Sequence, residues 1–268
     1  MHGKILVIAG SDSGGGAGIQ ADLKTINNLG AYATTAITAL TAQNSQAVKE
    51  ILPISIDFIT TQITTICSDI SIDSIKIGMV YNFNILNEII IILRKLLPDT
   101  PIILDPVMIA TSGAALAQTD LESLNILRSN IISNCYLITP NIAEAKVISN
   151  MEITNLNEMI NAGKYMQKLG AKNILIKGSH IDSSEINDVL IMQDSHIIFE
   201  SKRIKHNNNH GSGCSLASAI ATFIAQKAPL EQAVANARTY VYKAIEHAII
   251  PGNGNGTLNH CLTKISAV

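Results

Sequence analysis

The chain has 268 residues, of which 47% are hydrophobic and 15% are charged, and its formal net charge is −2. This composition supplies a large core and excludes a disordered or collagen-like chain. The nearly balanced charge gives no sign of a nucleic-acid partner. α/β folds often reach this length as one unit, so we expect one domain over residues 1–268.

The cysteines and the apolar segments bear on where the protein works. Cys67, Cys135, Cys214 and Cys261 show no C-x-x-C spacing, which argues against a disulfide scaffold or a thiol zinc site and favours a reducing compartment. The apolar run at residues 5–9 is too short for a signal peptide. Residues 85–97 are apolar but include three charges and are too short to span a membrane. We therefore expect a cytoplasmic protein without membrane contact.

Strand patterns alternate with helical patterns along the whole chain. Strands are expected at residues 4–9, 31–40, 74–77 and 101–104, and helices at 17–29, 57–70 and 84–97. Further along, the patterns predict a helix at 119–131 with Thr119 as N-cap, a strand at 136–138, helices at 142–149 and 156–169, a strand at 173–176, a hairpin at 189–199, and helices at 212–226 and 230–249. The alternation predicts a mostly parallel central sheet with helices on both faces, and the hairpin fits an edge of that sheet.

Glycine and polar residues follow each expected parallel strand. Ligands of open α/β sheets bind at the carboxyl ends of the strands, so we expect these segments to meet in one crevice. Any one of them alone would be an ordinary turn. The segments are residues 10–18, 39–44, 78–79, 105–108, 139–144 and 177–180.

A second glycine-rich segment, His210 to Cys214, directly precedes a helix of small residues. Free N–H groups and the helix dipole favour an anion at such a helix start, and glycine lets a phosphate come close. Cys214 is expected in the first turn, where the pKa of a thiol is typically lowered. The alternative is that Cys214 is only a small buried hydrophobic residue.

Two carboxylates and a lysine at the strand ends point to phosphate chemistry. Asp105 and Glu144 would suit Mg²⁺, which binds one or two carboxylates together with phosphate oxygens. Lys177 would place a charge on ATP phosphates. The alternatives are a helix cap or surface charge for each carboxylate, and a lysine that reaches solvent. The 10–18 loop matches neither a Walker loop nor G-x-G-x-x-G, and the histidines show no zinc spacing.

These motifs together resemble the hydroxymethylpyrimidine/phosphomethylpyrimidine kinases of thiamine biosynthesis. The similarity runs in order from about residue 5 to residue 260. The resemblance implies a ribokinase-like fold, which agrees with the alternation above, and commonly a homodimer. Its motifs are residues 9–22, 37–44, 76–79, 105–108, 139–145, 177–180 and 210–214.

The resemblance implies two ATP-dependent phosphorylations. The hydroxymethyl group of 4-amino-5-hydroxymethyl-2-methylpyrimidine is phosphorylated first, and the monophosphate is then converted to the diphosphate. The resemblance implies that Gln43 hydrogen-bonds the pyrimidine, and that its pocket is lined by Gly10, Asp22, Met79 and Val107.

The same resemblance assigns the ATP side of the site. It implies that Lys177, Asn141 and Glu144 serve the ATP phosphates and Mg²⁺, with Asp105 nearby. It also implies an anion hole at residues 211–214, formed by Gly211, Ser212, Gly213 and Cys214, with Cys214 as the base for the alcohol proton.

Two alternatives remain open from the sequence. One is a pyridoxal or pyridoxine kinase of the same superfamily, which makes the same transfer to a related ring. The other is a non-catalytic pyrimidine- or nucleotide-binding protein on a decayed kinase scaffold. Gln43 in its Ala-Gln-Asn context favours the pyrimidine, and intact Lys177 and Cys214 speak against decay.

Overall fold

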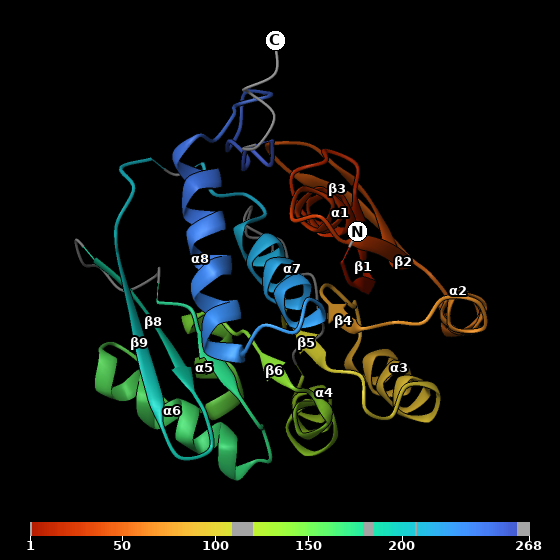
Figure 1. Cartoon of the computed structure of the whole chain (residues 1–268), viewed down its shortest axis with the longest axis horizontal. Helices are drawn as coiled ribbons and strands as arrows, with labels where there is room; N and C mark the ends of the chain where they lie inside the picture. Colours follow the sequence, from red (N-terminus) through yellow and green to blue (C-terminus); the bar gives the residue numbers. More distant parts are fainter. Residues whose placement is uncertain (1, 109–119, 179–184, 207, 262–268) are drawn as a thin grey trace.

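The computed structural model describes residues 2–108, 120–178, 185–206 and 208–261. Within these ranges the strands form one sheet in the order β3-β2-β1-β4-β5-β6-β7-β8-β9 (Figure 1). The six central strands, β2, β1, β4, β5, β6 and β7, are parallel to their neighbours. At one edge β3 pairs antiparallel with β2, and at the other β8 pairs antiparallel with β7 and β9. Their bounds are β1 Lys4–Asp12, β2 Tyr32–Gln43, β3 Val48–Pro53, β4 Ser74–Ile77, β5 Ile102–Leu104, β6 Leu137–Ile138, β7 Ile174–Ile176, β8 Glu185–Ile191 and β9 His196–Lys202.

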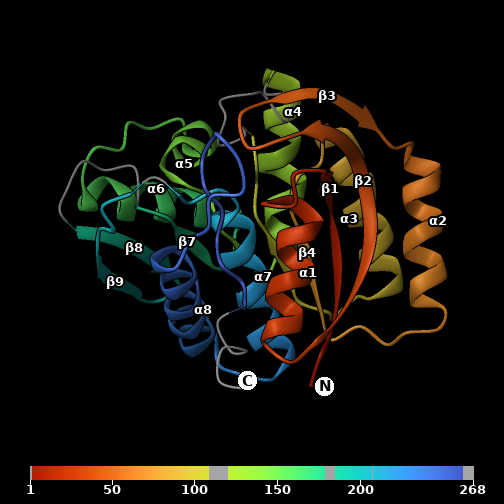
Figure 2. The same cartoon turned by 90° about the horizontal axis from the view of Figure 1, so that it is seen from above.

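Helices cover both faces of the sheet, which confirms the expected three-layer α/β architecture (Figures 1 and 2). Their bounds are α1 Gly18–Asn28, α2 Ile56–Cys67, α3 Phe83–Leu96, α4 Leu121–Ile126, α5 Ile142–Ser149, α6 Leu156–Lys168, α7 Ser212–Ala225 and α8 Leu230–Glu246. One core joins the sheet to α2 through α6, and the other joins it to α1, α7 and α8. None of the helices in the described ranges combines the length and the apolar character needed to cross a bilayer.

Strand β1 shows why a central strand reads as one continuous apolar run. Leu6 and Ile8 face the core beneath α2 and α3, whereas Ile5 and Val7 face the core beneath α1 and α7. Both faces of a parallel sheet are covered, so residues 5–9 of this strand are all apolar. From β1 the chain continues to β2 on one side, whereas β4 pairs with β1 on the other side. The strand order therefore reverses its direction at β1, and such a reversal leaves a crevice at the carboxyl ends of the strands.

Several expected element boundaries are corrected. β1 and β2 continue through Asp12 and Gln43, because their ladder extends past a register shift between Ala9 and Ser11. The N-cap of α4 is Asp120, whose carboxylate accepts from the N–H of Ser123 at 2.9 Å; Thr119 lies outside the described residues. The helix expected to reach residue 131 changes from α to π hydrogen bonding over Leu127–Ile131. Strand β3 was not expected from the sequence.

Candidate active site

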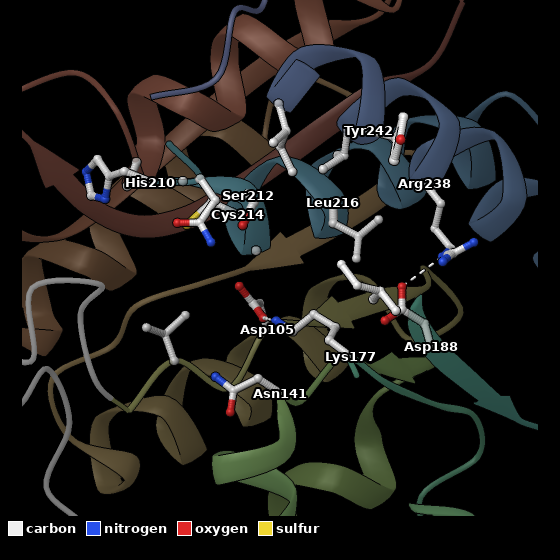
Figure 3. Close-up of a pocket in the computed structure, with 18 of the residues that line it drawn as sticks. Asp105, Asn141, Lys177, Asp188, His210, Ser212, Cys214, Leu216, Arg238 and Tyr242 are labelled. Atoms are coloured by element: carbon white, nitrogen blue, oxygen red, sulfur yellow. Dashed lines mark hydrogen bonds and ion pairs between the residues drawn. The ribbon is translucent and has the colours of Figure 1, made fainter. Parts of the chain in front are cut away.

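One cavity of about 970 Å³ collects nearly all the residues expected in the site (Figure 3). It runs along the carboxyl ends of the strands and is large enough for two small substrates. Its lining includes Gly10, Gln43, Met79, Asp105, Val107, Asn141, Glu144, Lys177, Gly211, Ser212, Gly213 and Cys214.

The start of α7 forms one wall of the cavity. Its N-cap, Gly211, has a φ of +86°, a left-handed conformation that suits glycine, and an added Cβ would overlap the carbonyl oxygen of Gly16. None of the described side chains caps this helix end. The N–H of Ser212 donates to the carbonyl oxygen of Asn209 at 3.0 Å, so the N–H groups of Gly213 and Cys214 are the ones available to an anion.

An ion pair faces this helix start from across the cavity. Lys177 Nζ lies 2.7 Å from Asp105 Oδ1, which also accepts a hydrogen bond from Thr139 at 3.1 Å. An added Cβ at Gly213 would lie 3.3 Å from Lys177 Nζ, so the amides of α7 and the ammonium approach the same space. Burial alone would lower the pKa of Lys177, but Asp105 and Glu144 outweigh it and raise the pKa.

Glu144 is both a helix cap and a buried charge. Asn141 and Glu144 form a capping box at the start of α5, with N–H to carboxylate and N–H to amide distances of 2.8 and 2.9 Å. Burial raises the pKa of Glu144 to about 7, Lys177 opposes the rise, and Asp105 adds to it. Glu144 is therefore a helix cap, as one of the two sequence interpretations expected, and it also lines the cavity.

Gln43 lines the same cavity, where its side chain lies beside His210. The Nε2 atoms of the two side chains lie 3.4 Å apart, and His210 Nε2 lies 3.1 Å from Asp12 Oδ2. Thr41 donates to the Gln43 carboxamide oxygen at 3.3 Å, which leaves the amide nitrogen as a donor. Asp12 and His210 were not assigned roles from the sequence, although both lie inside glycine-rich segments that the sequence singled out.

Two expectations about the site are corrected. Cys214 is in the first turn of α7, where it is half-buried in the cavity wall, but desolvation of its thiolate raises the pKa of the thiol to about 11. Asp22 does not line the cavity. It is fully buried, where its carboxylate pairs with Lys76 at 2.8 Å and accepts a hydrogen bond from Ser218 at 2.7 Å.

The far end of the cavity is built by residues that no sequence motif marked. Arg238 on α8 pairs with Asp188 on β8 at 2.8 Å (Figure 3). The Arg238 guanidinium also lies over the ring of Phe199. Asp188 also accepts from the N–H of Gly178, directly after Lys177, at 2.8 Å. Apolar side chains of Ile186, Leu216, Val241 and Ile204 line this end. An apolar slot of this kind, in the same cavity as the start of α7, suits a flat ring.

Comparison with known proteins gives consistent matches. Residues 12–259 match the family model described as phosphomethylpyrimidine kinase. The chain is 41% identical over 263 residues to the thiamine biosynthesis bifunctional protein ThiED of Geobacter sulfurreducens, covering 97% of this chain and 53% of that protein. It is 40% identical over 264 residues to the hydroxymethylpyrimidine/phosphomethylpyrimidine kinase of Haemophilus influenzae, covering 96% of each. The chain thus spans about half of the first relative and nearly all of the second.

A solved structure extends the comparison to three dimensions. The ADP complex of Bacillus subtilis pyridoxal kinase has a TM-score of 0.88 to this chain, with 31% identity, and the match covers 97% of this chain and 98% of that one.

Proposed function

The chain belongs to the phosphomethylpyrimidine kinase family and has its ribokinase-like fold, and from that premise we propose its reaction. It transfers the γ-phosphoryl group of ATP to the hydroxymethyl group of 4-amino-5-hydroxymethyl-2-methylpyrimidine, and then phosphorylates the monophosphate. One observation carries the proposal: Gln43, next to His210, shares a cavity with the uncapped start of α7 and with the facing Lys177–Asp105 pair.

The proposed mechanism is an in-line transfer in which positioning and electrostatics do most of the catalysis. The alcohol oxygen forms a bond to the γ-phosphorus while the bond to the bridging oxygen of ADP breaks. The amides of Gly213 and Cys214 and the Lys177 ammonium stabilise the charge on the moving group. The thiolate form of Cys214 accepts the alcohol proton and becomes the neutral thiol. The second acceptor is a phosphate that is already largely ionised, so it depends less on a base.

We propose that Asp105 and Glu144 hold Mg²⁺. Carboxylate oxygens are ligands that Mg²⁺ prefers, and ATP oxygens and water would complete its coordination. The pKa of Glu144, raised by burial to about 7, marks a carboxylate whose negative charge Lys177 balances only in part, and a cation would complete that balance. When bound, Mg²⁺ would neutralise charge on the phosphates.

The deciding experiment measures ADP release with the pyrimidine alcohol and with its monophosphate in separate reactions, with products identified by mass spectrometry. We expect turnover of both acceptors. Pyridoxal is assayed alongside, because the B. subtilis pyridoxal kinase shares 31% identity with this chain. A kcat/KM that is higher for pyridoxal would overturn the proposed substrate. Pyrimidine binding without any ATP consumption would revive the non-catalytic alternative.

We also propose that the protein is a cytoplasmic homodimer. The free thiols of Cys67, Cys135, Cys214 and Cys261 support a reducing compartment. Leu40 on β2 and Leu52 on β3 are cross-strand partners and are 42% and 58% exposed, so they form an apolar patch at one edge of the sheet. Sedimentation of the native chain and of an L40E/L52E variant tests the dimer; we expect the variant to be monomeric.

A further inference from the structure

A buried lysine behind the start of α7 has no part in the mechanism above. Lys76 on β4 is fully enclosed, and its Nζ lies 2.8 Å from a carboxylate oxygen of Asp22 on α1, which is also fully enclosed. Removing two charges from water costs several kcal/mol per ion, and apolar side chains of similar volume often serve stability equally well. Packing alone therefore gives no reason for this pair.

Two contacts join α1 to α7 near this lysine. The N–H of Gly18 is close enough to the sulfur of Cys214 to favour its thiolate, and the hydroxyl of Ser218 donates to Asp22 at 2.7 Å. Asp22 follows Gly18 by four residues, and Ser218 follows Cys214 by four, so each pair lies on one face of its helix. The two helices lie side by side (Figures 1 and 2). Lys76 is thus fixed about one helical turn from Cys214.

Strand β4 is shaped to hold the ammonium there. Ser74 donates to the carbonyl of Ala221 on α7 at 2.8 Å, which fixes the strand against the helix. An added Cβ at Gly78 would lie 2.6 Å from Lys76 Nζ, so this glycine leaves the space that the ammonium fills. Both residues belong to the segment Lys76-Ile-Gly-Met79, of which the proposed mechanism uses only Met79.

We propose that Lys76 is a positioning residue for Cys214, whose buried ammonium, held in place by Asp22, stabilises the thiolate form of that cysteine. This inference rests on the proposed function, in which the thiolate accepts the proton of the substrate hydroxyl. The Lys76–Asp22 pair would then contribute to catalysis through Cys214, and packing would not be its only role.

The charges around Cys214 support this assignment. Lys76 reaches it from β4, Asp22 from α1, Asp105 from the end of β5 and Lys177 from the end of β7. Burial raises the pKa of Cys214 to about 11, Lys76 opposes the rise, and Asp22 and Asp105 add to it. Lys177 is already engaged with Asp105 at 2.7 Å. Lys76 is paired equally closely with Asp22, at 2.8 Å, but it is the cation whose charge lowers the pKa of Cys214 most.

The test measures the rate at which iodoacetamide alkylates Cys214 between pH 7 and 10, followed by mass spectrometry of the Cys214 peptide without substrates. In a Lys76→Met variant we expect alkylation at pH 8 to slow at least about tenfold, because one pKa unit changes the thiolate fraction tenfold. Ser218→Ala is the matched control, because it alters the same cluster without removing the charge of Lys76. We expect its Cys214 rate to stay near the native rate.

A second variant and an internal reporter separate this effect from misfolding. K76M/D22N removes both charges, so no unpaired charge stays buried, and we expect Cys214 to remain slower than in the native chain. Cys135 is fully buried and reacts only if the fold opens. Native Cys214 rates in both variants, with Cys135 protected, would overturn the proposal. Loss of Cys135 protection in both variants would also overturn it, because the pair would then serve folding alone.

Kinase assays of the same variants complete the experiment. We expect the first phosphorylation to lose more kcat than the second, because only the alcohol needs a base. The alkylation rate does not depend on turnover. A chain that shows the expected alkylation but phosphorylates no pyrimidine would reject the proposed function and leave the role of Lys76 intact.

Discussion

The side chains of Gln43 and His210, 167 residues apart in sequence, lie 3.4 Å apart between their Nε2 atoms. Gln43 ends strand β2, whereas His210 directly precedes the Gly211 N-cap of α7. Their contact therefore joins the proposed heterocycle end of the cavity to the proposed phosphate end. This is the arrangement that phosphoryl transfer between two bound substrates requires.

Replacing Gln43 tests the heterocycle end. In Gln43→Ala we expect KM for the pyrimidine alcohol to rise about 10- to 100-fold with a smaller change in kcat, because a hydrogen bond to the ring is lost in ground state and transition state alike. Steady-state kinetics with saturating ATP measure both constants. Gln46→Ala, an exposed glutamine three residues away, is the matched control and should behave as native. A large drop in kcat at unchanged KM would contradict the binding role.

Replacing Cys214 tests the base. We expect Cys214→Ala to lower kcat of the first phosphorylation about 10²- to 10⁴-fold, the range typical of a general base, and to affect the second much less. Cys261→Ala removes an exposed thiol and should leave both rates unchanged. Equal losses in the two reactions would instead assign Cys214 to packing.

The pH dependence of the native enzyme follows from the raised pKa of Cys214, about 11. Below that pKa the thiolate fraction increases tenfold per pH unit, so log kcat/KM of the first reaction should climb from pH 7 to about pH 10. The second reaction, whose acceptor is already largely ionised, should rise much less over the same range. A first reaction that reaches a plateau near neutral pH would show that Cys214 is not the base.

Two glycines with similar backbone conformations should respond differently to alanine. Gly211 has a φ of +86° and no room for a Cβ, whereas Gly30 has a φ of +80° with open space around it. Gly30→Ala should therefore cost only about 1 kcal/mol of backbone strain and leave kcat unchanged. Gly211→Ala should displace the start of α7 and lower kcat at least about 100-fold. Thermal unfolding and kinetics of both variants check this, and equal activity would refute the anion-hole assignment.

Glu144 should make stability depend on pH. Its folded pKa of about 7 lies above the ordinary value of 4.5 for a glutamate. The folded state therefore binds a proton more tightly than the unfolded chain, and stability is lost as pH rises through this interval. The difference corresponds to roughly 3 kcal/mol. Glu144→Gln should therefore gain stability relative to the native chain at pH 8 but not at pH 4.5. Urea unfolding at both pH values, with a chelator present, measures this. An equal difference at both would contradict it.

Much of the fold is predictable because buried parallel strands read as short apolar runs between helical patterns. Strand β3 escapes this rule. Its span Val48–Pro53 includes Lys49, Glu50 and Pro53, and most of its side chains are exposed to solvent. Only the antiparallel pairing with β2 makes this segment a strand. The location of the site is predictable, because the carboxyl ends of parallel strands meet at one edge of the sheet.

The chemistry of the site was less accessible from the sequence than its location. The pKa of Cys214 depends on how completely the folded chain excludes water, and a helix-start motif carries no such information. Asp22 falls within a recognisable motif, yet its partner is a lysine inside a strand that reads as ordinary core. The Arg238–Asp188 pair joins two segments 50 residues apart with no local pattern to link them.

The Asp12 carboxylate accepts hydrogen bonds from the N–H groups of Gly14, Gly16 and Ala17 at 2.8 to 3.0 Å, and lies 3.1 Å from His210. A loop of three glycines would otherwise sample many conformations. Its disorder is removed while the protein folds, before any ligand arrives. Association at that end should therefore carry a small entropic penalty, and a molecule of the wrong outline meets a rigid wall that does not adapt to it.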